Sequence, residues 1–312
     1  MPEQKKIHPK LDKLLNFEKI SEGDIELPNG RDIEELISSR GAPRLFLSFY
    51  DEEMIRDALA RYGALSRLAR KGYSDIKIHL DTRNKNRERL IICNETFDYD
   101  HLLGEVTLTI GEYRAKEPYL AHLGARNFKM LYIQWLWLQD PNGKFTNERP
   151  ALPGQARPGL GIGDTVIKMM EGLALRLSLE GLINIPEYLH NAVLYDRRFN
   201  FLNPETQGRL EALKRCLQKY TLAELSWGVE LGCVSEARSG RRFSGLQEEQ
   251  VFPMAKELHD YFISDYYRET VKRISDKTEY SFDFPKFLEN YPLNPDFTPK
   301  TPPPPRSEPL ID

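Results

Sequence analysis

Cysteine is scarce in this chain, which has only three in 312 residues. Cys93, Cys216 and Cys233 form no CxxC pair and leave an odd number, so the pattern does not indicate a disulfide framework. Scarce, unpaired cysteine is typical of a reducing compartment, and we interpret these residues as buried packing residues. A chain of this length can bury a self-supporting core, so neither a disulfide nor a metal ion is needed for stability. We expect no metal.

Long apolar runs and an excess of one charge are also missing. No stretch approaches the roughly 18 to 20 apolar residues that a membrane-spanning helix requires, and no signal-peptide core follows the first lysines. The net charge is −3, from 44 basic and 47 acidic residues. Because the basic residues form no stripe that could neutralise many phosphates, we expect neither a membrane nor a nucleic acid as partner. The expected location is cytoplasmic.

The sequence that remains is typical of a globular protein, with 40% hydrophobic and 29% charged residues. Residues 1–40 are polar and predict an N-terminal arm. Amphipathic stretches after Asn203 predict a helical extension over 204–284. Nine prolines at and after position 285 predict an extended, proline-rich tail over 285–312.

Residues 41–203 have the patterns of a layered domain. Alternating or apolar segments predict strands at 45–50, 76–80, 89–93, 105–110, 128–138, 182–186 and 199–202, and helical spacing predicts helices from Asp51, over 166–178 and over 189–198. The segment from Phe128 to Leu138 is apolar on both faces apart from Gln134, which is typical of a central strand. The order predicts an α+β fold with a mixed central sheet flanked by helices.

A glycine-rich segment stands between the expected central strand and the helix that follows it. It reads Gln155-Ala-Arg-Pro-Gly-Leu-Gly-Ile-Gly163. Free backbone N–H groups and the helix dipole favour a bound anion at such a place, and glycine lets a phosphate approach the main chain. A tight turn is the alternative. The chain has no Gly-Lys-Ser/Thr of a P-loop, and its glycines lack the G-x-G-x-x-G spacing of a dinucleotide fold.

The order of strand, glycine loop, helix, strand and a helix with an aromatic hydroxyl resembles the core of the GNAT N-acetyltransferase superfamily. In that family the loop reads Gln or Arg, two residues, Gly, any residue, then Gly or Ala. Arg157 stands one residue out of register with it. The segment from Asn191 to Phe201 is similar to the family's Ala, two residues, Leu-Tyr and a basic stretch, with Leu194 and Tyr195 matching.

The resemblance implies an acyl-CoA-dependent N-acyltransferase with acetyl-CoA as its cofactor. The amides of Gly159, Gly161, Ile162 and Gly163, together with the Arg157 side chain, would hold the CoA pyrophosphate. The backbone near Gln134 and Trp135 would pair with the pantetheine arm, and Tyr195 would be the general acid that protonates the departing thiolate. The acceptor would be a small-molecule amine, a peptide or a protein lysine.

The residues do not single out a general base. Glu105, on the polar face of its strand, is the first candidate, Glu148 the second, and His190 a third. For each of them a structural role is the alternative. Two other functions stay open: a GNAT-like acyl-CoA-binding module without catalysis, and an interaction protein that shares only the fold. Oligomeric state is not predicted.

Overall fold

The computed structural model of this chain describes residues 45–115, 119–124 and 126–291. Its contacts divide the chain into two units at Arg44 and Leu45, and all described residues belong to the second unit. The arm expected at 1–40 and the tail after 291 lie outside the described residues.

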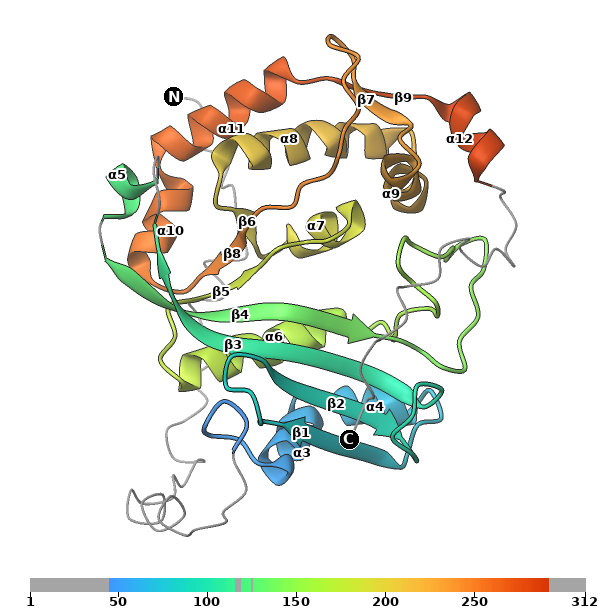
Figure 1. Cartoon of the computed structure of the whole chain (residues 1–312), viewed down its shortest axis with the longest axis vertical. Helices are drawn as coiled ribbons and strands as arrows, with labels where there is room; N and C mark the ends of the chain where they lie inside the picture. Colours follow the sequence, from blue (N-terminus) through green and yellow to red (C-terminus); the bar gives the residue numbers. More distant parts are fainter. Residues whose placement is uncertain (1–44, 116–118, 125, 292–312) are drawn as a thin grey trace, which may run out of the picture. The chain divides into compact units, whose positions relative to one another are not determined.

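The described residues form an α+β fold with a seven-stranded mixed sheet flanked by helices, as the sequence predicts (Figure 1). The strand order is β1-β2-β3-β4-β5-β8-β6, and only β4 and β5 run parallel. A separate pair joins β7 to β9. The strands are β1 Ile76–Asp81, β2 Glu88–Asn94, β3 Leu102–Arg114, β4 Asn127–Leu138, β5 Gly181–Asn184, β6 Asn200–Phe201, β7 Val234–Glu236, β8 Gln250–Pro253 and β9 Tyr280–Phe282.

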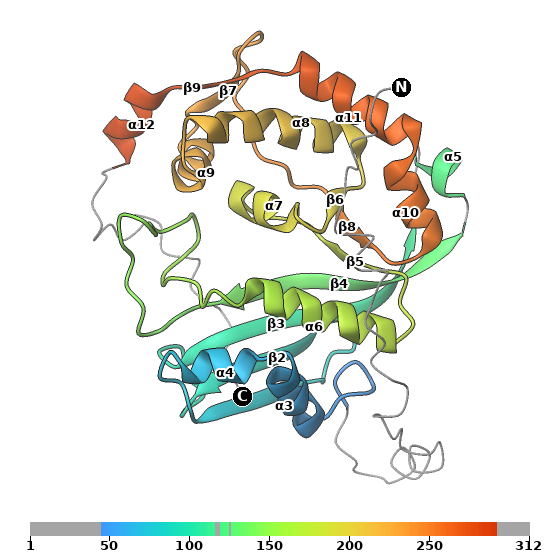
Figure 2. The same cartoon turned by 180° about the vertical axis from the view of Figure 1, so that it is seen from behind.

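Helices cover the sheet in separate groups, each with its own apolar cluster. The helices of the described residues are α3 Glu52–Arg61, α4 Ala64–Ala69, α5 Leu120–Leu123, α6 Gly163–Arg176, α7 Leu189–Tyr195, α8 Pro204–Lys214, α9 Leu222–Glu230, α10 Lys256–Ile263, α11 Asp265–Lys277 and α12 Phe284–Asn290, with a 3-10 turn at Arg215–Gln218. Figure 2 shows α3, α4 and α6 in front of one face of the sheet, and their residues share one large core cluster. A second cluster joins α7, α8 and α9.

The central strand is β4, which has three strands on either side, as its apolar sequence predicts. β3 pairs with it from Arg114 to Gly104, and a bulge at Thr107 and Leu108 leaves Gln134 as the extra residue. β5 pairs with β4 only from Met130 to Ile133. The two parallel strands therefore diverge beyond Ile133 of β4.

At the start of the domain, the expected strand is absent and the expected helix is present. Residues 45–50 form a turn closed by a Phe46–Tyr50 bridge rather than a strand, because their large side chains are buried in the core beside α3. The expected helix from Asp51 is present, and the Asp51 carboxylate accepts a hydrogen bond from the Met54 N–H at 2.8 Å.

The C-terminal region is not purely helical. Residues 250–253 form β8, which lies between β5 and β6 in the main sheet, so the expected extension supplies a strand to the central layer. The start of the expected tail is also folded, since Pro285 lies in the first turn of α12. Phe287 is fully buried there. A proline at a helix start costs no hydrogen bond, which is why its presence did not prevent a helix.

Helix α8 packs against α11 so closely that Gly208 leaves no room for a side chain. A Cβ at this position would lie 2.7 Å from the Ile274 Cβ and 2.8 Å from the Val271 carbonyl oxygen. We expect Gly208→Ala to lower the free energy of unfolding by about 1–3 kcal/mol, although alanine is the better helix former. Urea unfolding measures this change.

Gly172→Ala in α6 is the matched control. Its new methyl group would meet the hydroxyl end of Tyr62, an exposed side chain that can turn away. Alanine's helix propensity should then leave this variant unchanged or more stable by up to about 1 kcal/mol. Equal stability of the two variants would show that α8 and α11 can move apart at no cost.

Candidate active site

A cleft opens where β4 and β5 part. It has a volume of about 170 Å³ and is lined by three segments, namely 133–138 of β4, 153–157 of the loop before α6, and 184–195 between β5 and the end of α7. Only four residue pairs join β4 to β5, so no described strand pairs with the β5-facing edge of β4 after Ile133. That edge offers backbone hydrogen-bonding groups to an extended ligand.

Gln134 and Trp135 lie on β4 within this cleft, at the bulge. The exposed Gln134 side chain donates a hydrogen bond to the Asn86 carbonyl at 3.2 Å, and Trp135 stacks on Trp137 with ring centroids 5.8 Å apart. The Trp135 Nε1 is buried and has no hydrogen-bond partner among the described residues. A bulge beside a parting strand re-aims the backbone, as bulges next to active sites do.

The glycine segment lies between the end of β4 and the start of α6, and Gly159, Gly161, Ile162 and Gly163 are not among the residues that line the cleft. Gly161 has a φ of +74°, a left-handed conformation that glycine adopts without strain, and a Cβ at Gly161 or Gly163 would meet nothing within 4 Å. The N-cap of α6 is Ile162, which has no side chain able to accept a hydrogen bond. The first N–H groups of α6 are therefore open to an anion.

The charges around this helix start are mixed. Asp164 in the first turn pairs with Lys168 at 3.5 Å and with Arg198 at 3.4 Å. Arg198 also pairs with Glu171, whose pKa is raised because burial outweighs the neighbouring guanidinium. The two cations offset the Asp164 carboxylate, which by itself would repel a phosphate at this end of the helix.

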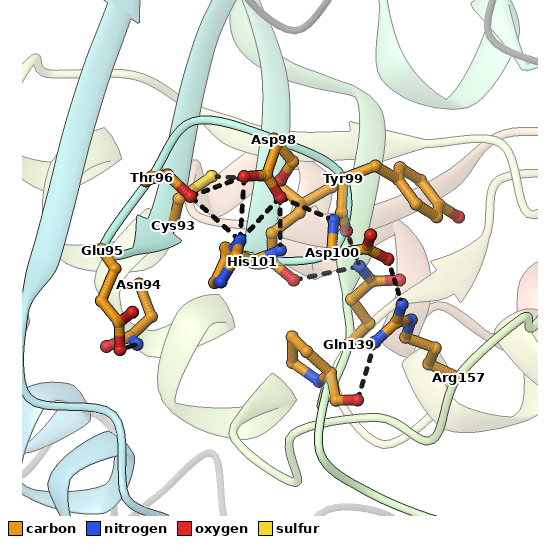
Figure 3. Close-up of polar contacts among 12 residues, drawn as sticks. Cys93, Asn94, Glu95, Thr96, Asp98, Tyr99, Asp100, His101, Gln139 and Arg157 are labelled. Carbon is orange, nitrogen blue, oxygen red and sulfur yellow. Dashed lines mark hydrogen bonds and ion pairs between the residues drawn. The ribbon is translucent and has the colours of Figure 1, made fainter.

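Arg157 lies in the wall of the cleft, with its guanidinium held by two acceptors. Nη1 donates to the Pro141 carbonyl at 2.7 Å, and Nη2 pairs with Asp100 at 2.6 Å (Figure 3). Arg157 also lines a second cavity of about 360 Å³ together with Glu95, His101 and Asn142. Because Asp100 is exposed, this ion pair contributes little free energy by itself, and the hold on Arg157 also includes the Pro141 carbonyl.

Tyr195 ends α7 and lines the cleft on the side facing β4. Its ring is half-buried and meets Phe199 edge-to-face, with centroids 5.5 Å apart. Burial raises the pKa of the phenol to about 12. Tyr195 therefore keeps its proton at neutral pH, which is the state that a general acid needs.

The three base candidates lie in different surroundings. Glu105 is buried on β3 opposite Trp137, its carboxylate is paired with Arg89 at 3.2 Å, and it is not among the residues that line the cleft. Glu148 is exposed and hydrogen-bonds to Thr146. His190 lines the cleft, and burial lowers its pKa to about 4, so the imidazole is neutral at physiological pH. Its buried Nδ1 has no partner among the described residues.

The sequence did not point to two other residues of the cleft. The Tyr188 ring stacks on His190 with centroids 5.5 Å apart and lies so close to Gly154 that a Cβ there would be 2.7 Å from the ring. Asn184 ends β5, and its buried Oδ1 lacks a partner among the described residues. The contact between Tyr188 and Gly154 joins two segments that are far apart in the sequence, so no local pattern indicated it.

Two further findings concern the described part of the chain alone. There, no three His, Cys, Asp or Glu side chains lie together as a metal ion would require. Nor does any helix of that part combine the length and apolar character needed to cross a membrane.

No protein-family model matches this chain. A curated relative is the proteasome-activating nucleotidase of Methanocaldococcus jannaschii, 27% identical over 163 residues, which are 48% of this chain. The chain spans 38% of that protein's length. The sequence of this chain has no Gly-Lys-Ser/Thr, so the candidate anion site at the start of α6 is not a P-loop.

Solved structures overlap this chain over part of its length. AtaTR bound with AcCoA has a TM-score of 0.27 at 18% identity and covers 41% of this chain and 88% of its own. A tyrosine-to-phenylalanine mutant of the AtaT toxin has a TM-score of 0.27 at 16% identity, and the match covers 41% of this chain and 83% of that one. A tyrosine-to-phenylalanine mutant of KacT has a TM-score of 0.25 at 14% identity, and the match covers 50% of this chain and 81% of that one.

Proposed function

We propose that this chain is an acyl-CoA-dependent N-acyltransferase that uses acetyl-CoA. One observation carries the proposal: the parallel strands β4 and β5 part to form a cleft with a protonated tyrosine on one wall, and the loop that supplies another wall leads into an uncapped, glycine-rich helix start. Among the functions that the sequence leaves open, this combination suits acyl transfer from CoA best. The acceptor is an amine whose identity is open.

The cleft and the start of α6 each have a task in this proposal. The amides of Gly161, Ile162 and Gly163 and the dipole of α6 bind the pyrophosphate of the cofactor. The free edge of β4 from Gln134 onward binds the pantetheine arm as an added strand would. When bound, acetyl-CoA supplies an activated thioester. Tyr195 holds at its Oη the proton that the leaving thiolate requires.

The proton of the acceptor amine needs a base that reaches the cleft. Neutral His190 lines it, whereas Glu105 is paired with Arg89 on β2 and does not line the cleft. We therefore propose His190 as the base in preference to Glu105. The second proposal, a GNAT-like protein that binds acyl-CoA without turning it over, requires that His190 does not act as the base, because the buried pairing with Arg89 keeps Glu105 out of the cleft.

Calorimetric titration of the full chain with acetyl-CoA tests the proposal, with ATP as the comparison ligand. We expect acetyl-CoA to bind with a dissociation constant on the order of 10 μM and ATP to bind at least about tenfold more weakly, because ATP has no pantetheine arm to pair with β4. Absence of acetyl-CoA binding would overturn both proposals. Thiol release with a panel of amines then separates the enzyme from the binding module.

A further inference from the structure

The segment 151–157, here called the cleft wall, belongs to the long loop between β4 and α6. Pro153, Gly154, Gln155 and Arg157 of this segment line the cleft. Its own backbone closes one turn, in which the Gln155 N–H donates to the Leu152 carbonyl at 3.0 Å. One such turn does not fix the position of a loop against its sheet, so the side chains that hold the wall decide the shape of the cleft.

Three side chains from outside or at the edge of the wall hold it. Arg157 binds the Pro141 carbonyl and Asp100, and the Tyr188 ring packs on the Gly154 backbone. At the first residue of the wall, the Trp227 Nε1 donates a buried hydrogen bond to the Ala151 carbonyl at 2.7 Å. This last contact joins residues 76 positions apart in the sequence.

Trp227 is itself firmly placed. It lies on α9, is 6% exposed and packs in a cluster with Cys233, Phe287 and Tyr291. Its ring centroid lies 5.7 Å from that of Tyr291, and Phe287 is completely buried. Figures 1 and 2 both show α9 and α12 on the side of the molecule where the long β4–α6 loop runs.

From these contacts we infer that Trp227 is a positioning residue for the cleft and that α9 and α12 form its support. The inference rests on the proposed function in so far as the ligand of the cleft is acetyl-CoA. None of the residues lining the described cleft comes from α9 or α12, so these helices act on the ligand indirectly: Trp227 acts through the wall, whereas the opposite contacts of α9 reach α7. Breaking the Trp227 hydrogen bond leaves a buried carbonyl at Ala151 unpaired and releases one end of the wall.

The test is Trp227→Phe in the full chain, which keeps an aromatic ring in the cluster and removes the N–H donor. We expect amide hydrogen exchange over residues 151–157 to become about tenfold faster, and the dissociation constant for acetyl-CoA to rise about five- to tenfold. The turnover number at saturating acetyl-CoA should change less than the KM for acetyl-CoA, because the wall affects the binding of this ligand.

Tyr261→Phe is the matched control. It removes another buried hydrogen bond to a backbone carbonyl, from the Tyr261 hydroxyl to Leu202 at 2.8 Å, in the same C-terminal region. We expect a similar loss of stability but unchanged exchange over 151–157 and unchanged acetyl-CoA affinity. A purely structural role of Trp227 would make the two variants behave alike.

The outcomes separate this inference from the proposed function. Wild-type exchange at the wall in Trp227→Phe overturns the inference, as does faster exchange with unchanged acetyl-CoA affinity. If wild type fails to bind acetyl-CoA, the proposed function is lost, and with it the inference as it concerns ligand affinity. Faster wall exchange in Trp227→Phe alone would then still support Trp227 as the residue that positions the wall.

Discussion

Gly161→Glu should weaken acetyl-CoA binding by about tenfold to a hundredfold, because it places a carboxylate beside the open N–H groups of α6. There is room for the side chain, since a Cβ at Gly161 meets nothing within 4 Å. The new carboxylate would both repel a pyrophosphate and compete for the same amides. Calorimetric titration with acetyl-CoA measures the change.

Gly161→Gln separates charge from backbone strain. Glutamine has nearly the shape of glutamate and suffers the same penalty at a φ of +74°, which is about 1 kcal/mol in either variant. We expect Gly161→Gln to bind acetyl-CoA within a few-fold of wild type, and the gap between the variants to shrink at high salt. If glutamate and glutamine have the same effect, the phosphates do not bind at this helix start.

Tyr195→Phe should lower the turnover number about a hundredfold and leave acetyl-CoA affinity unchanged, since the phenol acts on the leaving thiolate and not on the bound ground state. Phenylalanine keeps the edge-to-face contact with Phe199, so the fold should not suffer. Thiol release under saturating acetyl-CoA measures the turnover number, and calorimetry measures the affinity.

Tyr188→Phe is the control for this variant. Tyr188 lines the same cleft, and burial likewise raises the pKa of its phenol to about 12, with the nearby Glu187 carboxylate adding to the rise. Its ring contacts with His190 and Gly154 survive the loss of the hydroxyl. We expect a turnover number within about threefold of wild type. Equal losses in the two variants would argue against Tyr195 as the acid.

The pH dependence of the reaction follows from the same burial. Burial disfavours the phenolate, so the pKa of Tyr195 rises from 10 to about 12 and the acid stays protonated at all lower pH values. A loss of activity between pH 7 and 10 would then belong to another group. On the acidic side, His190 with a pKa of about 4 stays neutral down to that pH, so a His190 base predicts no acidic fall above pH 5.

Much of the layered domain could be predicted because the signals are local. The apolar run of β4, the helical spacing of α6 and the amphipathic stretch after Asn203 that forms α8 each lie within a single segment, and each element is present. The strand expected at 45–50 failed for the opposite reason. Its apolar side chains are buried by contacts with distant elements, and Leu47 and Ser48 adopt positive φ values that no local pattern indicated.

The candidate site divides in the same way. The glycine segment and Tyr195 were visible in the sequence, as was the central strand that holds Gln134 and Trp135. Arg157 was also singled out, but its partner Asp100 comes from the turn between β2 and β3, 57 positions away. The contribution of Tyr188, Asn184 and Trp227 depends on which surfaces meet after folding.

The sequence by itself determined the order of the elements, the glycine-rich start of α6 and the hydroxyl at the end of α7, because periodicity and turn residues act over a few neighbouring positions. Only the tertiary structure decided that β8 joins the central sheet, that β5 leaves β4 after four residue pairs, and that Trp227 holds the wall of the resulting cleft. These features depend on pairing and packing between residues far apart in the chain, and their free energy appears only when the whole core is assembled.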